Sequence, residues 1–119
     1  MPDSWFDITI ERGVVRVYHA RSARDAAEAH EVLAAIDARM EGTGIERVLF
    51  DSRDADRTPP EAAAVIWGWL QRRIDIRKVA TLMHSHELGR NMRRVGAESG
   101  VRIRMFADER EARRWLDDG

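Results

Sequence analysis

The sequence lacks cysteine altogether, and it contains no long run of apolar residues. Without cysteine the chain cannot form a disulfide, use a thiolate nucleophile or bind a metal through sulfur. No apolar run approaches the roughly 20 residues that a membrane-spanning helix needs, so we expect no integral membrane segment. The opening residues, Met1–Trp5, also lack the basic and apolar regions of a secretion signal. We therefore expect a cytoplasmic protein.

An excess of one charge is also lacking, because 20 basic residues are balanced by 21 acidic residues, for a net charge of −1. The basic residues are dispersed among acidic ones and are not interleaved with stacking aromatic side chains, so we expect no nucleic-acid partner. Of the 119 residues, 44% are hydrophobic and 34% are charged. A chain of this length buries enough surface for one hydrophobic core and too little for two. We expect residues 1–119 to form a single domain.

Strand patterns occur in five segments of the chain. These segments are residues 7–10, 14–18, 47–51, 78–83 and 101–106. The first alternates polar and apolar residues and the second is rich in β-branched residues, which are both typical of strands. Gly13 between these two segments predicts a tight hairpin turn. The two segments that follow are short apolar runs, which predict buried strands.

Helical periodicity occurs in four further segments. They are residues 22–41, residues 62–73, a segment that begins at Ser85 and a segment that follows Asp108. Ser22 with Asp25 predicts the N-terminal cap of the first helix, and Thr58 with Glu61 predicts that of the second. The resulting element order is ββαβαβαβα. It predicts an α/β fold in which helices pack on a mixed β-sheet of about five strands, parallel except for the opening hairpin.

The element order and three segments resemble the SpoIIAA-like superfamily. The segments are Val48–Asp51, Lys78–Leu82, and Ile103–Phe106 followed by Glu111–Leu116. This superfamily includes the STAS domains of sulfate transporters and anti-sigma-factor antagonists, and small bacterial SpoIIAA-like proteins of STAS/SEC14 type. The resemblance covers roughly residues 5–117. It implies a SpoIIAA-like fold and a non-enzymatic binding or regulatory module that acts through protein–protein contacts.

One part of the chain departs from the pattern of the antagonists. In those proteins an Asp-Ser-Ser-Gly-like segment carries a phosphorylated serine at the start of the helix after the third strand. The corresponding residues here are Arg57–Ala62, which contain neither serine nor glycine. Thr58 is the one hydroxyl at this helix start, and Ser52 lies six residues earlier. The departure favours a module without the standard phosphoserine switch, with Ser52 and Thr58 kept as candidate binding residues.

The helix over residues 62–73 is apolar on nearly all sides. Trp67 and Trp69 are two residues apart, so they are expected to point to nearly opposite sides of the helix. One tryptophan can enter the core, and the other requires cover from a neighbouring helix, a ligand or a second subunit. Tryptophan is enriched at interface hot spots. Val65, Trp67 and Trp69 are therefore candidate binding residues, and we predict a homodimer or a protein partner at this helix.

An alternative function is the carriage of a small apolar ligand or lipid, which the SEC14-like resemblance implies by analogy. This alternative predicts a hydrophobic cavity of several hundred Å³. Its predicted lining is Val65, Ile66, Trp69, Leu88 and Met92.

A less favoured alternative is an enzyme that uses His84, His86 and Asp51. These residues lie near strand ends, where a base or metal ligand would be placed. The spacing fixes no third metal ligand, and no Gly-x-Ser-x-Gly turn surrounds Ser52. We therefore predict no catalytic residue, no metal and no cofactor, and we keep His84 and His86 as candidate binding residues.

Overall fold

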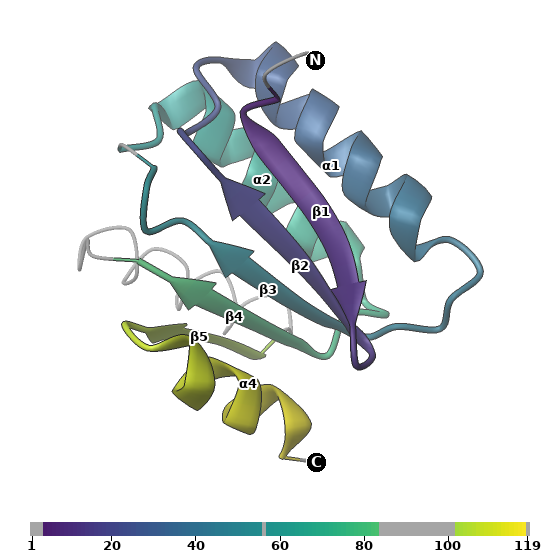
Figure 1. The fold of residues 1–119 in the computed structure, drawn as a ribbon. Helices are drawn as coiled ribbons and strands as arrows, with labels where there is room; N and C mark the ends of the chain where they lie inside the picture. The colour runs from purple at the N-terminus through teal and green to yellow at the C-terminus, as the bar shows by residue number, and fades with distance from the viewer. Residues whose placement is uncertain (1–3, 56, 84–101, 119) are drawn as a thin grey trace.

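The structure is a computed structural model that describes residues 4–55, 57–83 and 102–118. Its sheet contains five strands that lie side by side in chain order (Figure 1). They are β1 (Phe6–Glu11), β2 (Val14–His19), β3 (Arg47–Asp51), β4 (Lys78–Leu82) and β5 (Arg102–Phe106). β1 pairs antiparallel with β2, and the other neighbouring strands pair in parallel. The prediction of a mixed sheet of about five strands is confirmed.

The hairpin between β1 and β2 turns within two residues. Arg12 and Gly13 both have positive φ, at 53° and 76°, as expected for the two-residue turn whose twist matches that of the flanking strands. Glycine adopts such an angle without steric cost. β1 is an edge strand, and Arg39 of the first helix donates a hydrogen bond of 2.8 Å to its Ile8 carbonyl. This contact occupies a backbone acceptor of the edge strand.

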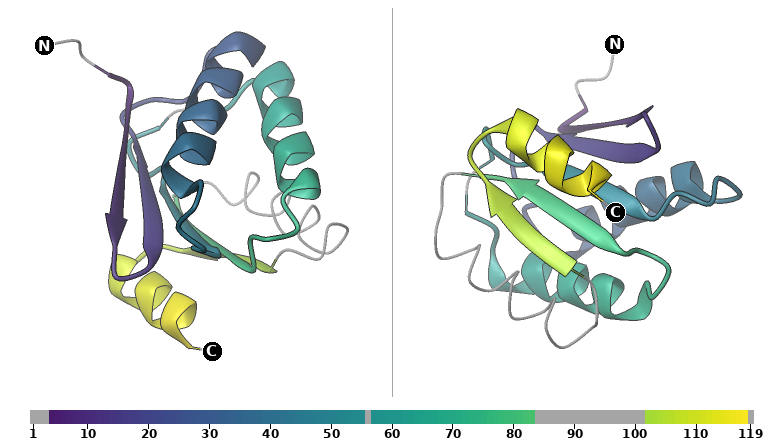
Figure 2. Two further views of the ribbon diagram at one scale, coloured as in Figure 1. Left: turned by 90° about the vertical axis from the view of Figure 1, so that its right-hand side faces the viewer. Right: turned by 90° about the horizontal axis from the view of Figure 1, so that it is seen from below.

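Three described helices cover the two faces of the sheet. α1 (Ala26–Met40) and α2 (Pro60–Arg72) pack against each other on one face, and α4 (Glu109–Asp117) lies on the opposite face (Figure 2). Right-handed crossovers between successive parallel strands place consecutive helices on the same side. We call the two sides the α1/α2 face and the α4 face. The helix predicted from Ser85 lies outside the described residues.

The apolar core is divided between these two faces, because neighbouring residues of a strand point to opposite sides. The buried strand residues on the α1/α2 face include Val15, Val17, Val48, Phe50 and Val79. Those on the α4 face are Val14, Leu49, Ala80 and Leu82, which pack with Ala112 and Leu116 of α4. The central strands are therefore buried on both sides, which explains their unbroken apolar runs.

The structure corrects two predicted helix starts. α1 begins at Ala26, and its N-cap is Asp25, whose carboxylate accepts a hydrogen bond from the Glu28 amide at 2.9 Å. Ser22 therefore does not cap this helix. α2 begins at Pro60, and its N-cap is Pro59, which makes no side-chain cap hydrogen bond, so Thr58 does not cap it either. In both cases the serine or threonine precedes the true cap. α1 starts four residues after its predicted start at residue 22, and the cap of α2 is Pro59, the residue after Thr58.

The C-terminal end of α4 is held by Lys78 of β4. The Lys78 side chain is 4% exposed, and its Nζ donates hydrogen bonds to the carbonyls of Trp115, at 2.7 Å, and Asp118. A cation is favourable there because the carbonyls at a helix C-terminus carry partial negative charge. Within the described part of the chain, no helix has the length and apolar character needed to cross a bilayer.

Candidate functional site

The carboxyl ends of β2, β3 and β4 lie at the same end of the sheet, because these strands run in parallel. We call this end the carboxyl edge of the sheet. Open α/β sheets bind their ligands at this edge. Residues 52–59, which we call the β3–α2 loop, leave the central strand there and lead directly into α2. The loop carries both hydroxyl residues that the sequence analysis selected.

Ser52 is half-buried and continues the pairing of β3 with β4. Its amide donates a hydrogen bond to the Leu82 carbonyl at 2.8 Å, and its own carbonyl accepts one from Ala55 at 3.1 Å. The backbone of Ser52 is thus fixed by the sheet on one side and by a turn on the other. The loop begins from a rigid point rather than from a free strand end.

Thr58 lies at the other end of the loop, beside the segment that precedes α1. Its Oγ1 is 3.5 Å from Oγ of Ser22, which is the outer limit of a hydrogen bond. Thr58 is half-buried, whereas Ser22 is 9% exposed. The structure therefore brings together two hydroxyls that are 36 residues apart in the chain. The sequence analysis had assigned both of them to separate helix caps.

Asp51, at the end of β3, lies between two arginines. Its carboxylate is 2.7 Å from Nη2 of Arg16 and 2.9 Å from Nη2 of Arg53. Burial by itself would raise the pKa of Asp51, but the hydrogen bonds and charges of Arg53 and Arg16 outweigh burial and lower it. Asp51 is 3% exposed and stays ionised. A carboxylate so firmly paired is a poor proton acceptor, which disfavours the alternative of an enzyme that uses Asp51.

The same charges connect the sheet to α4. Arg16 donates two hydrogen bonds to Glu109, from Nε and Nη2, each of 3.0 Å, in the two-pronged geometry that arginine forms with carboxylates. The hydrogen bond from Arg16 is the main cause that lowers the pKa of Glu109. Arg113 donates to the same carboxylate at 2.9 Å. We call Arg16, Asp51, Arg53, Glu109 and Arg113 the ionic cluster.

The sequence analysis missed the ionic cluster. Arg16 and Asp51 are 35 residues apart, and Arg16 and Glu109 are 93 residues apart. Only one local signal was present, namely an arginine inside the otherwise apolar segment 14–18. A charged residue at that position of a buried strand requires a charged partner.

His19 lies at the end of β2 on the α1/α2 face. Its ring is 5.9 Å from the ring of Trp5 and 5.9 Å from that of Phe50, measured between centroids. Desolvation lowers the pKa of His19 to about 4, against the smaller opposing effect of the Asp51 charge. Its Nε2 is buried, and no residue in the described ranges forms a hydrogen bond with it. His19 is therefore a neutral, half-buried side chain near neutral pH, with its Nε2 atom buried.

His84 and His86 lie outside the described residues. Among the residues that are described, no group of three or more histidine, aspartate or glutamate side chains is arranged to hold a metal ion.

The two tryptophans of α2 differ in exposure. Trp69 is 4% exposed, and its indole Nε1 donates a hydrogen bond of 2.9 Å to Asp37 of α1. The guanidinium of Arg73 lies 5.3 Å from the centroid of the Trp69 ring. Trp67 and Val65 are half-buried and contact the same core. Trp69 is therefore covered from within the chain, by α1 and by Arg73.

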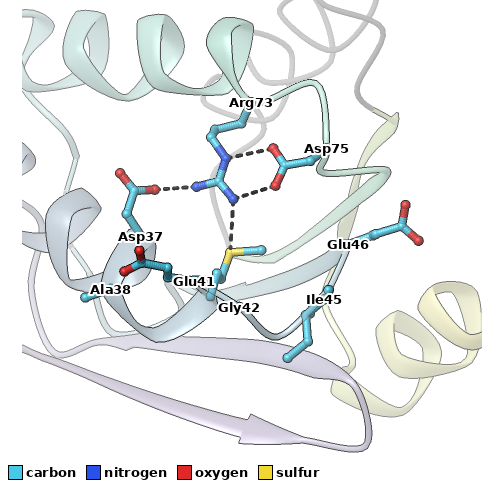
Figure 3. Close-up of a pocket in the computed structure, with 10 residues that line it drawn as sticks. Asp37, Ala38, Glu41, Gly42, Ile45, Glu46, Arg73 and Asp75 are labelled. Carbon is cyan, nitrogen blue, oxygen red and sulfur yellow. Dashed lines mark hydrogen bonds and ion pairs between the residues drawn. The ribbon is translucent and has the colours of Figure 1, made fainter.

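A hollow of about 620 Å³ lies at the opposite end of the helices, where α1 and α2 end. Figure 3 shows Arg73 between Asp37 and Asp75, both of which pair with it, while a nitrogen of its guanidinium lies 3.8 Å from the sulfur of Met40. Glu41 and Glu46 also line the hollow. It does not contain Val65, Ile66 or Trp69, which were predicted to line an apolar cavity, and half of its ten lining residues are charged.

No protein-family model matches this sequence, and a search of curated protein sequences returned no match. Solved structures do match. A protein from Shewanella loihica of the DUF3478 family, described as having a SpoIIAA-like fold, superposes with a TM-score of 0.70 at 15% identity, over 93% of this chain and 91% of that one. The chain has a SpoIIAA-like fold. The resemblance predicted from the sequence is confirmed at the level of the fold.

Two further solved structures with this fold connect it to regulation. One is a Thermotoga maritima protein assigned as an anti-sigma factor antagonist, with a TM-score of 0.69, 16% identity and coverage of 94% of each chain. The other is the unphosphorylated anti-sigma factor antagonist SpoIIAA, with a TM-score of 0.66, 14% identity and coverage of 96% of this chain and 99% of that one. Identities this low support a common fold and no more. The SpoIIAA-like fold is thus one that regulatory binding proteins use.

Proposed function

We propose that this chain is a non-enzymatic regulatory module that binds a protein partner at the carboxyl edge of its sheet, in the cytoplasm. The partner-binding surface is formed by the β3–α2 loop, with Ser52 and Thr58, and by the start of α2. The observation that carries the proposal is the placement of this loop. It leaves the central strand from a fixed backbone at Ser52 and enters a helix that has no side-chain cap.

The chemistry of the edge supports binding rather than catalysis. Asp51 is held by Arg16 and Arg53, and His19 has a buried Nε2 atom and a lowered pKa. These groups fix the end of the sheet and leave the loop as the variable part, which is the usual division between a rigid scaffold and a binding loop. The SpoIIAA-like fold of two anti-sigma factor antagonists supports the same interpretation.

We also propose that the module works without a phosphoserine switch. Arg57–Ala62 contains no serine, and the Thr58 hydroxyl is half-buried against Ser22. Mass spectrometry of the chain isolated from its native cells is expected to show no phosphate on Ser52 or Thr58. Substantial phosphorylation of either residue would contradict this part of the proposal and leave the binding surface itself untouched.

Site-specific photo-crosslinking tests the binding surface. A photoreactive amino acid at Thr58 is expected to capture a protein in the native cells, and the same amino acid at Ala38 serves as the control. Ala38 is exposed on α1 and lines the hollow at the opposite end of the helices. Capture at both positions alike, or at neither, would contradict the proposal.

Calorimetry with the captured protein after purification then measures the binding directly. Thr58→Arg is expected to weaken binding about tenfold or more, because it places a long charged side chain at the interface. Ala38→Arg adds the same side chain elsewhere and is expected to leave the affinity unchanged. An unchanged affinity for Thr58→Arg would overturn the assignment of the loop.

A further inference from the structure

One side of α2, at the border of the side that packs in the core, carries a pattern of charges that neither the core nor the β3–α2 loop explains. Val65 on this side is half-buried and also contacts the core. Glu61, Val65, Gly68 and Arg72 recur at intervals of three and four residues, so they share one side of the helix. Glu61 and Arg72 are exposed, whereas Val65 and Gly68 are half-buried between them. Ala64, also exposed, lies beside this row. The face is therefore small and apolar in the middle and charged at both ends.

The two end charges have opposite signs. Glu61 lies in the first turn of α2 and Arg72 in the last. Each is favourable for the dipole of its own helix, but neither side chain forms a hydrogen bond or ion pair with any other residue in the described ranges. α2 has 13 residues and is therefore about 20 Å long. The two charges thus lie too far apart to pair within one helix.

A second α2 helix, running antiparallel, complements this face. In that arrangement Glu61 of each copy lies opposite Arg72 of the other, so two ion pairs form and the two helix dipoles oppose each other. The same alignment along the helix places Val65 of each copy opposite Gly68 of the other. One register therefore satisfies the charges and the packing together.

Gly68 is suited to receive the Val65 side chain. A Cβ atom at Gly68 would meet only a side-chain nitrogen of Arg72, at 3.3 Å, and that nitrogen is the end of a flexible chain. When Arg72 extends toward Glu61 of the second copy, the space above Gly68 is open. Helices approach each other closely where one of them lacks a side chain.

We propose that α2 is a self-association surface that takes α2 of a second copy of this chain in an antiparallel, two-fold arrangement. Glu61 and Arg72 set the register, and Val65 and Gly68 form the contact at the centre. A single helix face is smaller than the roughly 800 Å² per partner of a stable interface. The dimer is therefore reversible and depends on concentration.

Charge exchange tests the register by sedimentation. The wild-type chain is expected to shift from monomer to dimer as its concentration rises in analytical ultracentrifugation. Glu61→Arg or Arg72→Glu alone places like charges opposite each other twice, and either change is expected to weaken the dimer about tenfold. Combining both changes restores opposite charges and is expected to restore the dimer. Glu31→Arg and Arg110→Glu, at exposed positions of α1 and α4, are the matched controls and are expected to change nothing.

Disulfide trapping provides a second test that does not depend on these charges. Because the chain has no cysteine, Val65→Cys and Gly68→Cys variants each carry a single thiol. Mixed in equal amounts and oxidised, they are expected to form mostly the mixed disulfide between position 65 of one copy and position 68 of the other. Ala38→Cys, at an exposed position of α1, is expected to form no such preferred cross-link.

Three results would overturn the proposal. They are a monomer at every concentration, a double charge exchange that fails to restore the dimer, and random disulfide pairing in the mixture. A thermal melt followed by circular dichroism verifies that each variant is folded, and the trapping experiment decides the outcome if a charge variant is not. None of these results bears on the β3–α2 loop, which is tested by Thr58→Arg.

Discussion

The two faces of the sheet are stabilised by different means. The α1/α2 face is packed with apolar side chains, and it also buries two polar atoms, Nε2 of His19 and Oγ1 of Thr81, for which no described residue is a partner. The α4 face has a smaller apolar cluster, and the ionic cluster joins its helix to β2 and β3. A 15-residue and a 13-residue helix cover the first face, and a 9-residue helix covers the second. A short helix with little apolar surface needs ion pairs to hold it in place.

This difference predicts that the two faces respond differently to substitutions and to salt. Stability that comes from apolar packing changes with cavity volume and hardly with salt. Stability that comes from ion pairs near the surface changes with salt and with the loss of either partner. Substitutions at four residues separate the two kinds, in order of decreasing effect.

The largest effect is expected for Trp69→Ala on the α1/α2 face. It removes a side chain that is 4% exposed and should lower the free energy of unfolding by about 3–5 kcal/mol. Urea denaturation measures this change. Trp69→Phe keeps most of the packing but loses the hydrogen bond to Asp37 and a little volume. The lost hydrogen bond should cost about 1 kcal/mol in addition to the cost of the lost volume. Equal losses for the two variants would show that the hydrogen bond, and not the packing, dominates.

Asp51→Asn tests the ionic cluster. The change leaves Arg16 and Arg53 without their shared carboxylate and should cost about 2–3 kcal/mol. Raising the salt concentration should reduce the difference between this variant and the wild type, because the arginine side chains are 20% and 34% exposed. A difference that is unaffected by salt would contradict the assignment of this stability to the charge of Asp51, because asparagine can still accept the hydrogen bond from the Arg53 amide.

His19 gives the α1/α2 face a dependence on pH. Its pKa is lowered to about 4 in the folded chain, from the ordinary value of 6.5. The unfolded chain therefore binds the extra proton first, and stability decreases as the pH falls below 6.5. Between pH 6.5 and pH 5 the loss should be about 2 kcal/mol. Urea denaturation of His19→Phe, which cannot titrate, should show a flatter profile over this interval, and an identical slope would rule out His19 as the cause.

The smallest effect is expected for Arg113→Ala at the outer edge of the ionic cluster. Arg113 pairs with Glu109 and with Glu11, whose side chain is 50% exposed. Exposed pairs contribute little, so the free energy of unfolding should change by less than about 1 kcal/mol. Hydrogen exchange at the α4 amides should nonetheless become faster, because this helix loses one of its links to the sheet. A global loss as large as that of Asp51→Asn would contradict the ranking within the cluster.

The strands, their order along the chain and the opening hairpin could be predicted from local patterns. Alternation at 7–10 and the apolar run at 47–51 correspond to β1 and β3, and Gly13 lies in the turn that was predicted. Such features depend on neighbouring residues only. The exact caps could not be predicted in the same way, because Ser22 and Asp25 are both acceptable cap residues and tertiary packing decides between them.

The candidate site could be predicted only in part. Ser52 and Thr58 were selected for their position relative to a strand and a helix, and the structure places both in the β3–α2 loop. The contact of Thr58 with Ser22, and the pairing of Arg16 with Glu109, join segments far apart in the chain. Their partners depend on how the elements stack on each sheet face. A single sequence carries no direct signal of that stacking.

The chain contains a single lysine, Lys78, and the folded structure hides it. Its amine is bound to carbonyls at the end of α4, so an acylating reagent can reach it only when that helix detaches. The rate at which Lys78 is acylated therefore reports how often the C-terminal helix opens. Lys78 is thus a natural reactive group that reports the opening, and no reactive residue has to be introduced by mutation.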